Sequence, residues 1–377
     1  MPLQSDFELE AHFMSPLVSF VLPTRNRPQE LAHTIEKLGT LPPTIDAEVI
    51  VVDNHSREPA SIAARLPNGW HACTLRRPRN EGAAARNDGV RIAGGTWIVM
   101  LDDDSHPLDM GFVDALIAAP GDVAAVGGEI LLPNGEHEQG GMPETIVGCG
   151  AAIRREAFVA AGGYDPAFHF YVEEYDLCAR LLLGGWRVVH DSRLRVLHTK
   201  TPTNRDMGVV LGRLMRNNGW VLRRYAPDSV YEPALRETIE RYESIATKEG
   251  VLAGYRAGLD EFLATVDDQQ RTPMDDGLWR RFSGEAAARA AFAQHRGMLA
   301  GRRTALVHSG KAAPLLERLI CEWGGLRTSE HDAETLVIGT LSPGPILDAQ
   351  RALAGEARPV LAPWSFAVQP APMLRAG

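Results

Sequence analysis

Gly94-Gly95-Thr96-Trp97-Ile98-Val99-Met100-Leu101-Asp102-Asp103-Asp104 is an apolar run of strand length that ends in three carboxylates. A short apolar run bounded by turn residues is typical of a buried strand. Residues two apart in a strand point to the same side, so we expect Asp102 and Asp104 to share a face and Asp103 to point away. Two carboxylates on one face repel each other unless a cation lies between them, and a divalent metal with oxygen ligands suits that place. The alternative is an acidic turn before a helix, since Ser105-His106-Pro107 follows.

Two earlier apolar runs end in a similar way. Residues 17–22 are followed by Pro23-Thr24, residues 48–52 are followed by Asp53, and helical patterns separate the runs. Alternating strands and helices indicate a parallel sheet wound with helices. Ligands of such sheets bind beyond the carboxyl ends of the strands, which is where Thr24, Asp53 and Asp104 fall. This convergence favours a binding site over an acidic turn.

Composition restricts the class of protein. A chain of 377 residues suggests two or three domains, and 45% hydrophobic with 23% charged residues is typical of a globular protein with a substantial core. No apolar run reaches the roughly 18 residues of a membrane span, and residues 1–13 lack the features of a secretory signal. The four cysteines are widely spaced and fit neither a disulfide framework nor a zinc site. We therefore expect a cytoplasmic protein, and the net charge of −9 argues against a nucleic-acid partner.

A second acidic cluster, Glu173-Glu174-Tyr175-Asp176, stands at the start of a helical pattern that ends at Gly184-Gly185. Carboxylates at a helix N-terminus are stabilised by the macrodipole, so these residues fit a structural cap as well as a catalytic group. The small residues at 148–153 are of the kind that a ligand can approach closely. Both stretches are therefore candidates for a site near the acidic strand end.

Taken in order, these motifs resemble glycosyltransferase family 2, and most closely its rhamnosyltransferase-like members. The resemblance covers about residues 16–227. It implies a GT-A fold, which is an α/β fold with a mostly parallel, Rossmann-like wound sheet. It also implies an inverting, metal-dependent, hexosyltransferase-type enzyme that moves a sugar from a nucleoside-diphosphate sugar to an acceptor hydroxyl. The matching motifs are residues 18–24, Asp53, Asn80-Glu81-Gly82, Arg86-Asn87-Asp88-Gly89, Asp102-Asp103-Asp104, Arg154-Arg155-Glu156, Gly162-Gly163-Tyr164-Asp165 and Glu173-Glu174-Tyr175-Asp176-Leu177-Cys178.

The resemblance also implies roles for single residues. Asp102 and Asp104 match the Asp-x-Asp pair that holds Mn²⁺ or Mg²⁺, and His198 matches a position where histidine often completes the metal shell. Imidazole beside two oxygens suits manganese at least as well as magnesium, and the metal neutralises the diphosphate leaving group as a Lewis acid. A lone histidine at a strand end has a structural alternative, which we expect for His190. The residues matched to the donor pocket are Thr24, Arg27, Asp53, Asn80, Arg86, Asn87 and Asp102.

The general base implied by the resemblance is Glu174, at a position where aspartate is commoner. The ordinary pKa values differ little, about 4.3 for glutamate and 3.9 for aspartate. The extra methylene moves the carboxylate by about an ångström, and reach matters more than basicity for a general base. Either the pocket is wider here, or Asp176 serves as the base.

Beyond residue 227 the resemblance ends. We expect an N-terminal extension over residues 1–15, a GT-A domain over 16–227, a helical segment over 228–300 and a small Rossmann-like α/β domain with a tail over 301–377. The small domain is predicted from strands at 304–308, 334–338 and 358–361 separated by helices at 312–323 and 346–353. It would serve acceptor binding or homo-oligomerisation.

A helical pattern over residues 204–225 places several arginines opposite an apolar side. These arginines form either a solvated face or a binding surface for an anionic acceptor or for membrane headgroups. Binding to headgroups would hold the protein at the inner face of a membrane. Two internal glycines, Gly208 and Gly212, argue against one unbroken helix. The arginines are Arg205, Arg213, Arg216, Arg223 and Arg224.

Two other functions stay open. A nucleotidyltransferase would also use a wound sheet and a carboxylate pair on a metal, but it has no need of Glu174. A catalytically silent carbohydrate-binding or scaffold protein would keep the fold without the base. Fold-level resemblance identifies neither the sugar and nucleotide nor the acceptor, which is a carbohydrate, a lipid-linked molecule or another small molecule.

Overall fold

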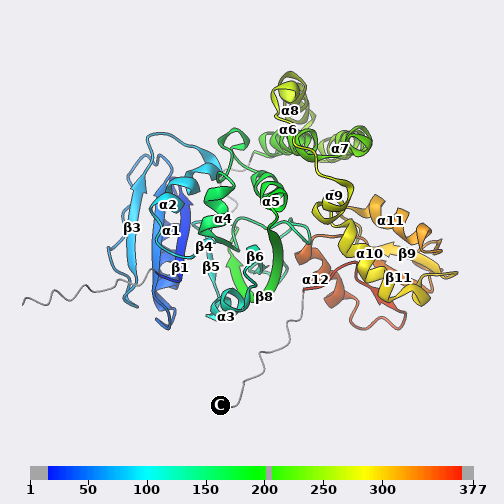
Figure 1. Ribbon diagram of the computed structural model, residues 1–377, viewed down its shortest axis with the longest axis horizontal. Coiled ribbons are helices and arrows are strands. Elements are labelled where there is room, and N and C mark those ends of the chain that lie inside the picture. Colours follow the sequence, from blue (N-terminus) through cyan, green and yellow to red (C-terminus); the bar gives the residue numbers. More distant parts are fainter. Residues whose placement is uncertain (1–15, 201–205, 367–377) are drawn as a thin grey trace, which may run out of the picture.

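The computed structural model describes residues 16–200 and 206–366. Figure 1 shows a large sheet in the N-terminal half, a group of long helices beside it, and a small sheet at the C-terminal side. The predicted extension over residues 1–15, Arg205 and the part of the tail beyond residue 366 lie outside the described residues. Within the described residues, no helix combines the length and the apolar character that crossing a bilayer requires.

The first half of the large sheet is parallel. The strands run in the order β3-β2-β1-β4, and Thr24 at the end of β1 is paired with Asp53 at the end of β2. Two predicted strand ends therefore meet at one edge, and the predicted α/β fold with a wound sheet is confirmed. The elements are β1 (Val18–Thr24), α1 (Pro28–Thr40), β2 (Ala47–Asp53), β3 (His71–Arg76), α2 (Arg86–Ile92) and β4 (Trp97–Met100).

The second half of the sheet is mixed, in the order β7-β6-β8-β5. β7 runs antiparallel to both β4 and β6, β6 and β8 are parallel, and β5 runs antiparallel to β8. The last pairing sets His198 opposite Ser105, so it brings the end of β8 beside the acidic stretch. The elements are β5 (Ser105–Pro107), α3 (Gly111–Ala118), β6 (Val123–Leu131), β7 (Ala151–Arg154), α4 (Arg155–Ala160), α5 (Glu173–Leu183) and β8 (Arg187–His198).

The central strands are buried on both faces. Phe20 and Leu22 of β1 belong to one hydrophobic cluster, and Val21 belongs to another on the opposite face. A strand covered on both sides has no polar face, which is why these runs are continuously apolar in the sequence.

Three long helices follow the large sheet: α6 (Met207–Tyr225), α7 (Asp228–Lys248) and α8 (Leu252–Thr265). α6 is unbroken, so the helix predicted there is confirmed over its described residues and the two glycines do not interrupt it. A Cβ atom on Gly258 would lie 2.1 Å from the carbonyl oxygen of Gly212, and one on Gly254 would lie 2.3 Å from that of Gly208. The glycines therefore let α6 and α8 approach each other closely.

The arginines of α6 do not form a continuous free surface. Arg216 is 8% exposed and pairs with Glu261, Arg223 lies 3.6 Å from Asp267, and Arg224 is held by carboxylates of the large-sheet region. Contact with a membrane or an anionic acceptor through this face stays a prediction, and these pairings weigh against it.

The C-terminal part contains a parallel four-stranded sheet in the order β10-β9-β11-β12. Its strands and helices fall where they were predicted, within a few residues, except for the two-residue β10, which was not predicted. The division of the chain into domains stays a prediction. The elements are α9 (Asp276–Phe282), α10 (Glu285–Gln294), β9 (Arg303–Val307), α11 (Ala313–Glu322), β10 (Leu326–Arg327), β11 (Thr335–Ile338), α12 (Pro343–Ala352) and β12 (Val360–Leu361).

Candidate active site

The three aspartates lie just beyond β4, in a turn rather than in the strand. The prediction that strand alternation turns Asp103 away was therefore wrong, because Arg27 pairs with both Asp103 (2.8 Å) and Asp104 (2.6 Å). Asp103 also accepts a hydrogen bond from the Thr24 hydroxyl at 2.8 Å. Asp102 pairs instead with Arg86, whose side chain is buried. The turn is thus fixed by ion pairs to the first loop and to α2.

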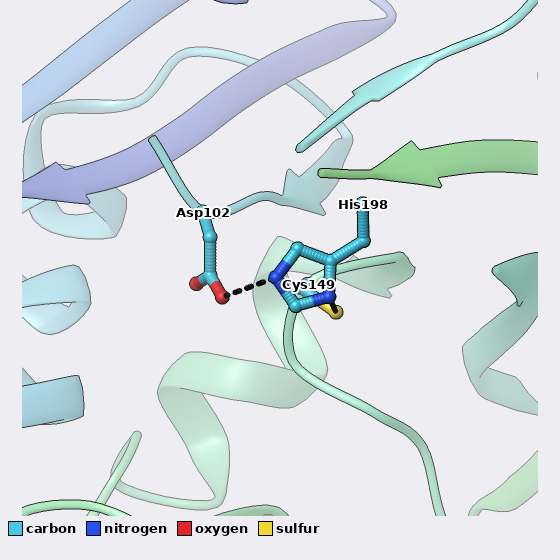
Figure 2. Close-up of side chains that lie close together, drawn as sticks. All are labelled: Asp102, Cys149 and His198. Carbon is cyan, nitrogen blue, oxygen red and sulfur yellow. Dashed lines mark hydrogen bonds and ion pairs between the residues drawn. The ribbon is translucent and has the colours of Figure 1, made fainter. Parts of the chain in front are cut away.

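His198 reaches this turn through the pairing of β5 with β8. Its Nε2 atom lies 3.3 Å from Asp104 Oδ1 and 4.0 Å from Asp102 Oδ2. On the other side of the ring, Nδ1 lies 2.7 Å from Glu138 Oε2 and 3.5 Å from Cys149 Sγ. Figure 2 shows the imidazole between the carboxylate of Asp102 and the thiol of Cys149. The predicted residues Asp102, Asp104 and His198 therefore do meet, although through strand pairing and not through alternation.

The charges in this cluster are balanced. Burial alone would lower the pKa of His198, but hydrogen bonding to Asp104, Cys149 and Glu138 raises it to about 12. Burial alone would raise the pKa of Asp104, yet His198 and Arg27 hold it well below its ordinary value. Burial alone would also raise the pKa of Glu138, but hydrogen bonds from His198 and Lys200 lower it to about 2. The carboxylates around His198 favour its protonated form, and a metal ligated by Nε2 would take the place of the proton on that atom.

These residues fit a divalent metal. In the described part of the chain, Asp102, Cys149 and His198 offer ligand atoms that all lie within 4.8 Å of one another, and Asp104 contacts the same Nε2 atom. Burial raises the pKa of the Cys149 thiol to about 11, and a protonated thiol is a poor ligand. Two carboxylates with the Nε2 atom form a set that suits Mn²⁺. Glu138 on Nδ1 would then orient the ring, as carboxylates behind metal-bound histidines commonly do.

Asp53 has a different environment from the one predicted. It is fully buried and accepts hydrogen bonds from the backbone N–H groups of Ser56 (2.8 Å) and Ala60 (3.1 Å). Burial alone would raise the pKa of Asp53, but these hydrogen bonds lower it. The carboxylate is therefore charged, and it shapes the loop after β2. A cavity of about 390 Å³ lies between this loop and the first loop, where Thr24 and Arg27 line it. A direct contact of Asp53 with a nucleotide stays a prediction.

The two asparagines predicted for the donor pocket also serve the backbone. Asn87 donates to the carbonyl of Tyr164 at 2.8 Å and accepts from its N–H at 2.9 Å. Asn80 accepts from the N–H of Gly82 at 3.1 Å. Their binding roles stay predictions, and for Asn87 the geometry favours positioning of the loop before α5.

The two candidate bases differ sharply in their contacts. Asp176 is fully buried and accepts from Arg180 (2.6 Å), Arg224 (2.8 Å) and the Tyr225 hydroxyl (2.7 Å). Glu174 accepts from the N–H of Gly148 at 3.0 Å. It is only partly buried.

Burial raises the pKa of Glu174 above its ordinary value. Burial and the neighbouring Glu174 carboxylate raise the pKa of Glu173 well above the ordinary value for glutamate. A carboxylate with a raised pKa and few partners suits a general base, whereas Asp176 is enclosed by cations and a hydroxyl.

Sequence reasoning missed several residues of this site. Glu138 lies in a loop that carries no recognisable pattern, and Cys149 was noted only for the small residues around it. The use of Asp103 as an anchor for Thr24 and Arg27 depends on the turn after β4. None of these contacts has a sequence signal of its own, because each joins residues far apart in the chain.

A sheet whose parallel strands end at a cluster of acids and a histidine defines a ligand-binding α/β protein. Residues 19–136 match the family model of Glycosyl transferase family 2. These residues therefore carry a glycosyltransferase family 2 domain, and the resemblance to that family is confirmed, whereas its rhamnosyltransferase-like part stays a prediction.

Two relatives are similar over part of the chain. O-antigen biosynthesis protein RfbC of Myxococcus xanthus is 25% identical over 230 residues, which are 51% of this chain and 18% of the relative. An uncharacterized glycosyltransferase of Haemophilus influenzae is 28% identical over 195 residues, 44% of this chain and 62% of the relative. The matches thus span less than two thirds of either relative.

Solved structures show weaker similarity. The crystal structure of GalNAc-T7 with UDP, GalNAc and Mn²⁺ is 15% identical, with a TM-score of 0.49 over 67% of this chain and 57% of that one. The structure of residues 1–349 of S. aureus TarS in complex with UDP-GlcNAc is 14% identical, with a TM-score of 0.47 over 72% of this chain and 91% of that one.

Proposed function

We propose that this protein is an inverting, metal-dependent glycosyltransferase that moves a sugar from a nucleoside-diphosphate sugar to an acceptor hydroxyl, with Glu174 as the general base. The observation that carries the proposal is a family 2 domain in which Asp102, Asp104 and His198 meet at the carboxyl ends of the strands. Glu174 stands close enough to this cluster for the Asp102 carboxylate to raise its pKa further.

Each group of the site has a part in the proposal. Asp102, Asp104 and the Nε2 atom of His198 would hold Mn²⁺ or Mg²⁺, which when bound neutralises charge on the diphosphate leaving group. Arg86 keeps Asp102 in place, and Arg27 does the same for Asp104. These pairs fix the carboxylates before ligand arrives, which lowers the cost of ordering the site.

The reaction is a single displacement at the anomeric carbon. The acceptor oxygen forms its bond to that carbon while the bond to the diphosphate breaks, and the configuration inverts. Glu174 takes the proton of the acceptor hydroxyl. Its single N–H contact leaves oxygen lone pairs available for that proton, and its raised pKa brings it nearer to neutral pH, where a general base is most effective.

Glu174→Gln is the test. We expect turnover of the productive donor, measured as release of nucleoside diphosphate across a donor panel, to fall by about 10²–10⁴-fold, the usual contribution of a general base. Donor binding should stay within a few-fold of the wild type. Glu156→Gln is the matched control, because Glu156 is an exposed acid in the first turn of α4.

Two results would contradict the proposal. Full turnover in Glu174→Gln would remove Glu174 from the base role. No turnover and no nucleotide binding in the wild-type protein would instead favour a silent carbohydrate-binding or scaffold protein. The domain division, the acceptor, the cytoplasmic location and self-association through the C-terminal part stay predictions.

A further inference from the structure

A pocket of about 460 Å³ is lined by residues of α5, α6, α7, α9 and α11 and by the first residue of α10. Figure 1 shows α5 beside the large sheet and α11 beside the small one. The volume of the pocket is in the range of small-molecule sites. Tyr175 of α5 contributes to the wall from the family 2 domain, and Lys311, just before α11, contributes from the C-terminal part. The pocket is therefore assembled from segments that are far apart in the chain.

Three cations that line this pocket, Lys311, Arg241 and Arg318, form no ion pair within the described residues. Lys311 is partly buried, and its ammonium donates to the Tyr175 hydroxyl at 2.6 Å and lies 3.9 Å from the centre of that ring. Arg241 contacts the ring and hydroxyl of Tyr242. Within the described residues, neither cation forms an ion pair with a carboxylate, and the same holds for Arg318, which also lines the pocket.

The cations affect each other. Burial and, to a smaller extent, the positive charge of Arg241 lower the pKa of Lys311 to about 7. A half-buried charge without a counterion is costly. An anion placed between Lys311 and Arg241 would remove the repulsion and supply the missing partner.

Carboxylates also line the pocket, but they do not neutralise this pair. Glu285 is held by Arg289 at 2.6 Å and lies 3.9 Å from Arg280. Glu237 and Asp276 are exposed, as Arg241 is, and within the described residues neither acid forms an ion pair with Lys311 or Arg241. The remaining wall includes apolar side chains that an organic ligand would cover, among them Val221, Leu222, Trp279, Phe282 and Leu315.

The pocket is adjacent to the proposed base. Tyr175 directly follows Glu174 in α5, and the Glu174 carboxylate is near enough to raise the pKa of Lys311 against the two effects that lower it. The pocket therefore borders the turn of α5 that also carries Glu174.

We infer that this pocket binds a phosphate-bearing acceptor, with the phosphate between Lys311 and Arg241 and the organic part against the apolar wall. The assignment as an acceptor site rests on the proposed function, whereas phosphate binding itself does not. Arg presents a planar fork of donors and Lys a compact charge, and the two together suit a tetrahedral anion.

The experiment is calorimetric titration of the full chain, without donor, with three probes: glycerol 3-phosphate, dodecyl phosphate below its micellar concentration, and dodecyl maltoside as the neutral amphiphile. We expect the phosphate probes to bind, and we expect Lys311→Met and Arg241→Gln to weaken their binding, Lys311→Met by about ten- to hundredfold, as loss of a charged hydrogen bond does. Arg256→Gln is the matched control, since Arg256 is an exposed arginine of α8 outside the pocket.

The outcomes separate the sources of phosphate. Binding of both phosphate probes assigns the pocket to phosphate as such, and binding of dodecyl phosphate alone assigns it to phosphate on a lipid. Equal binding of dodecyl maltoside, unchanged binding in Lys311→Met, or no binding of either phosphate probe overturns the inference. Metal-dependent nucleotide binding, measured in parallel, tests the proposed function, whereas binding of the phosphate probes tests this pocket. A failure of one is therefore distinguishable from a failure of the other.

Discussion

Asp176 and the Lys311 pocket both border the same helix, α5. They differ in whether the charged side chain has partners of opposite charge. Asp176 is fully buried, and two arginines and a tyrosine hydroxyl satisfy it. Lys311 is partly buried, and among the described residues its ammonium contacts the hydroxyl and ring of Tyr175 but no carboxylate. A buried charge that is fully paired holds a structure together, whereas one without a counterion stands ready for a ligand. The difference teaches which charges of this molecule are structural and which are available for binding.

The same contrast separates the two candidate bases. Both Glu174 and Asp176 lie in the first turn of α5. The family resemblance names Glu174 as the base and leaves Asp176 as the alternative. The structure gives Asp176 cationic partners and gives Glu174 one backbone N–H. Removing Asp176 should therefore damage the fold, while removing Glu174 should damage the chemistry.

The largest effect is expected from Asp176→Asn. The substitution leaves Arg180 and Arg224 without their shared carboxylate, and breaking a buried pair from one side costs about 3–5 kcal/mol. The free energy of unfolding, from urea denaturation at pH 7, should fall by that amount. Asp260→Asn, which changes an exposed aspartate of α8, should be near neutral. Equal stability of the two variants would show that the ion pairs around Asp176 do not hold the fold.

A smaller effect is expected from the pH dependence of Lys311. Its pKa is about 7 in the folded chain and 10.5 ordinarily, so the unfolded chain binds more protons between these values. The free energy of unfolding then rises with pH by at most about 1.4 kcal/mol per unit. The wild-type protein should therefore gain stability relative to Lys311→Met as the pH is raised from 7 to 9. Parallel curves would show that Lys311 carries no unpaired charge.

The parts of the fold that follow local patterns were predictable. The parallel half of the large sheet was predicted from the apolar runs of β1, β2 and β4 and the turn residues that follow them. The small sheet was predicted from alternating strands and helices. The pairing of β5 with β8 was not predictable, because Ser105-His106-Pro107 has no strand pattern and its partner lies far away in the chain. That pairing is what places His198.

The site was predictable only as a set of residue types. Family motifs pointed to Asp102, Asp104 and His198, and the structure brings all three together. Glu138 and Cys149 could not be found, because their place beside His198 depends on the folding of a loop without a pattern. The Lys311 pocket could not be predicted either, since its walls come from six helices.

The central claim is that the acid and histidine cluster binds a nucleoside diphosphate through a divalent metal. The most direct measurement is calorimetric titration of the wild-type protein with UDP, GDP, TDP, CDP and ADP, each with and without Mn²⁺. We expect one nucleotide to bind only with Mn²⁺, and Asp104→Asn to weaken that binding by about 10²–10³-fold, as loss of a charged ligand worth several kcal/mol implies. Asp122→Asn, which changes an exposed acid paired with Arg187, should bind like the wild type. Binding of no nucleotide, or binding that neither Mn²⁺ nor Asp104→Asn alters, would contradict the account.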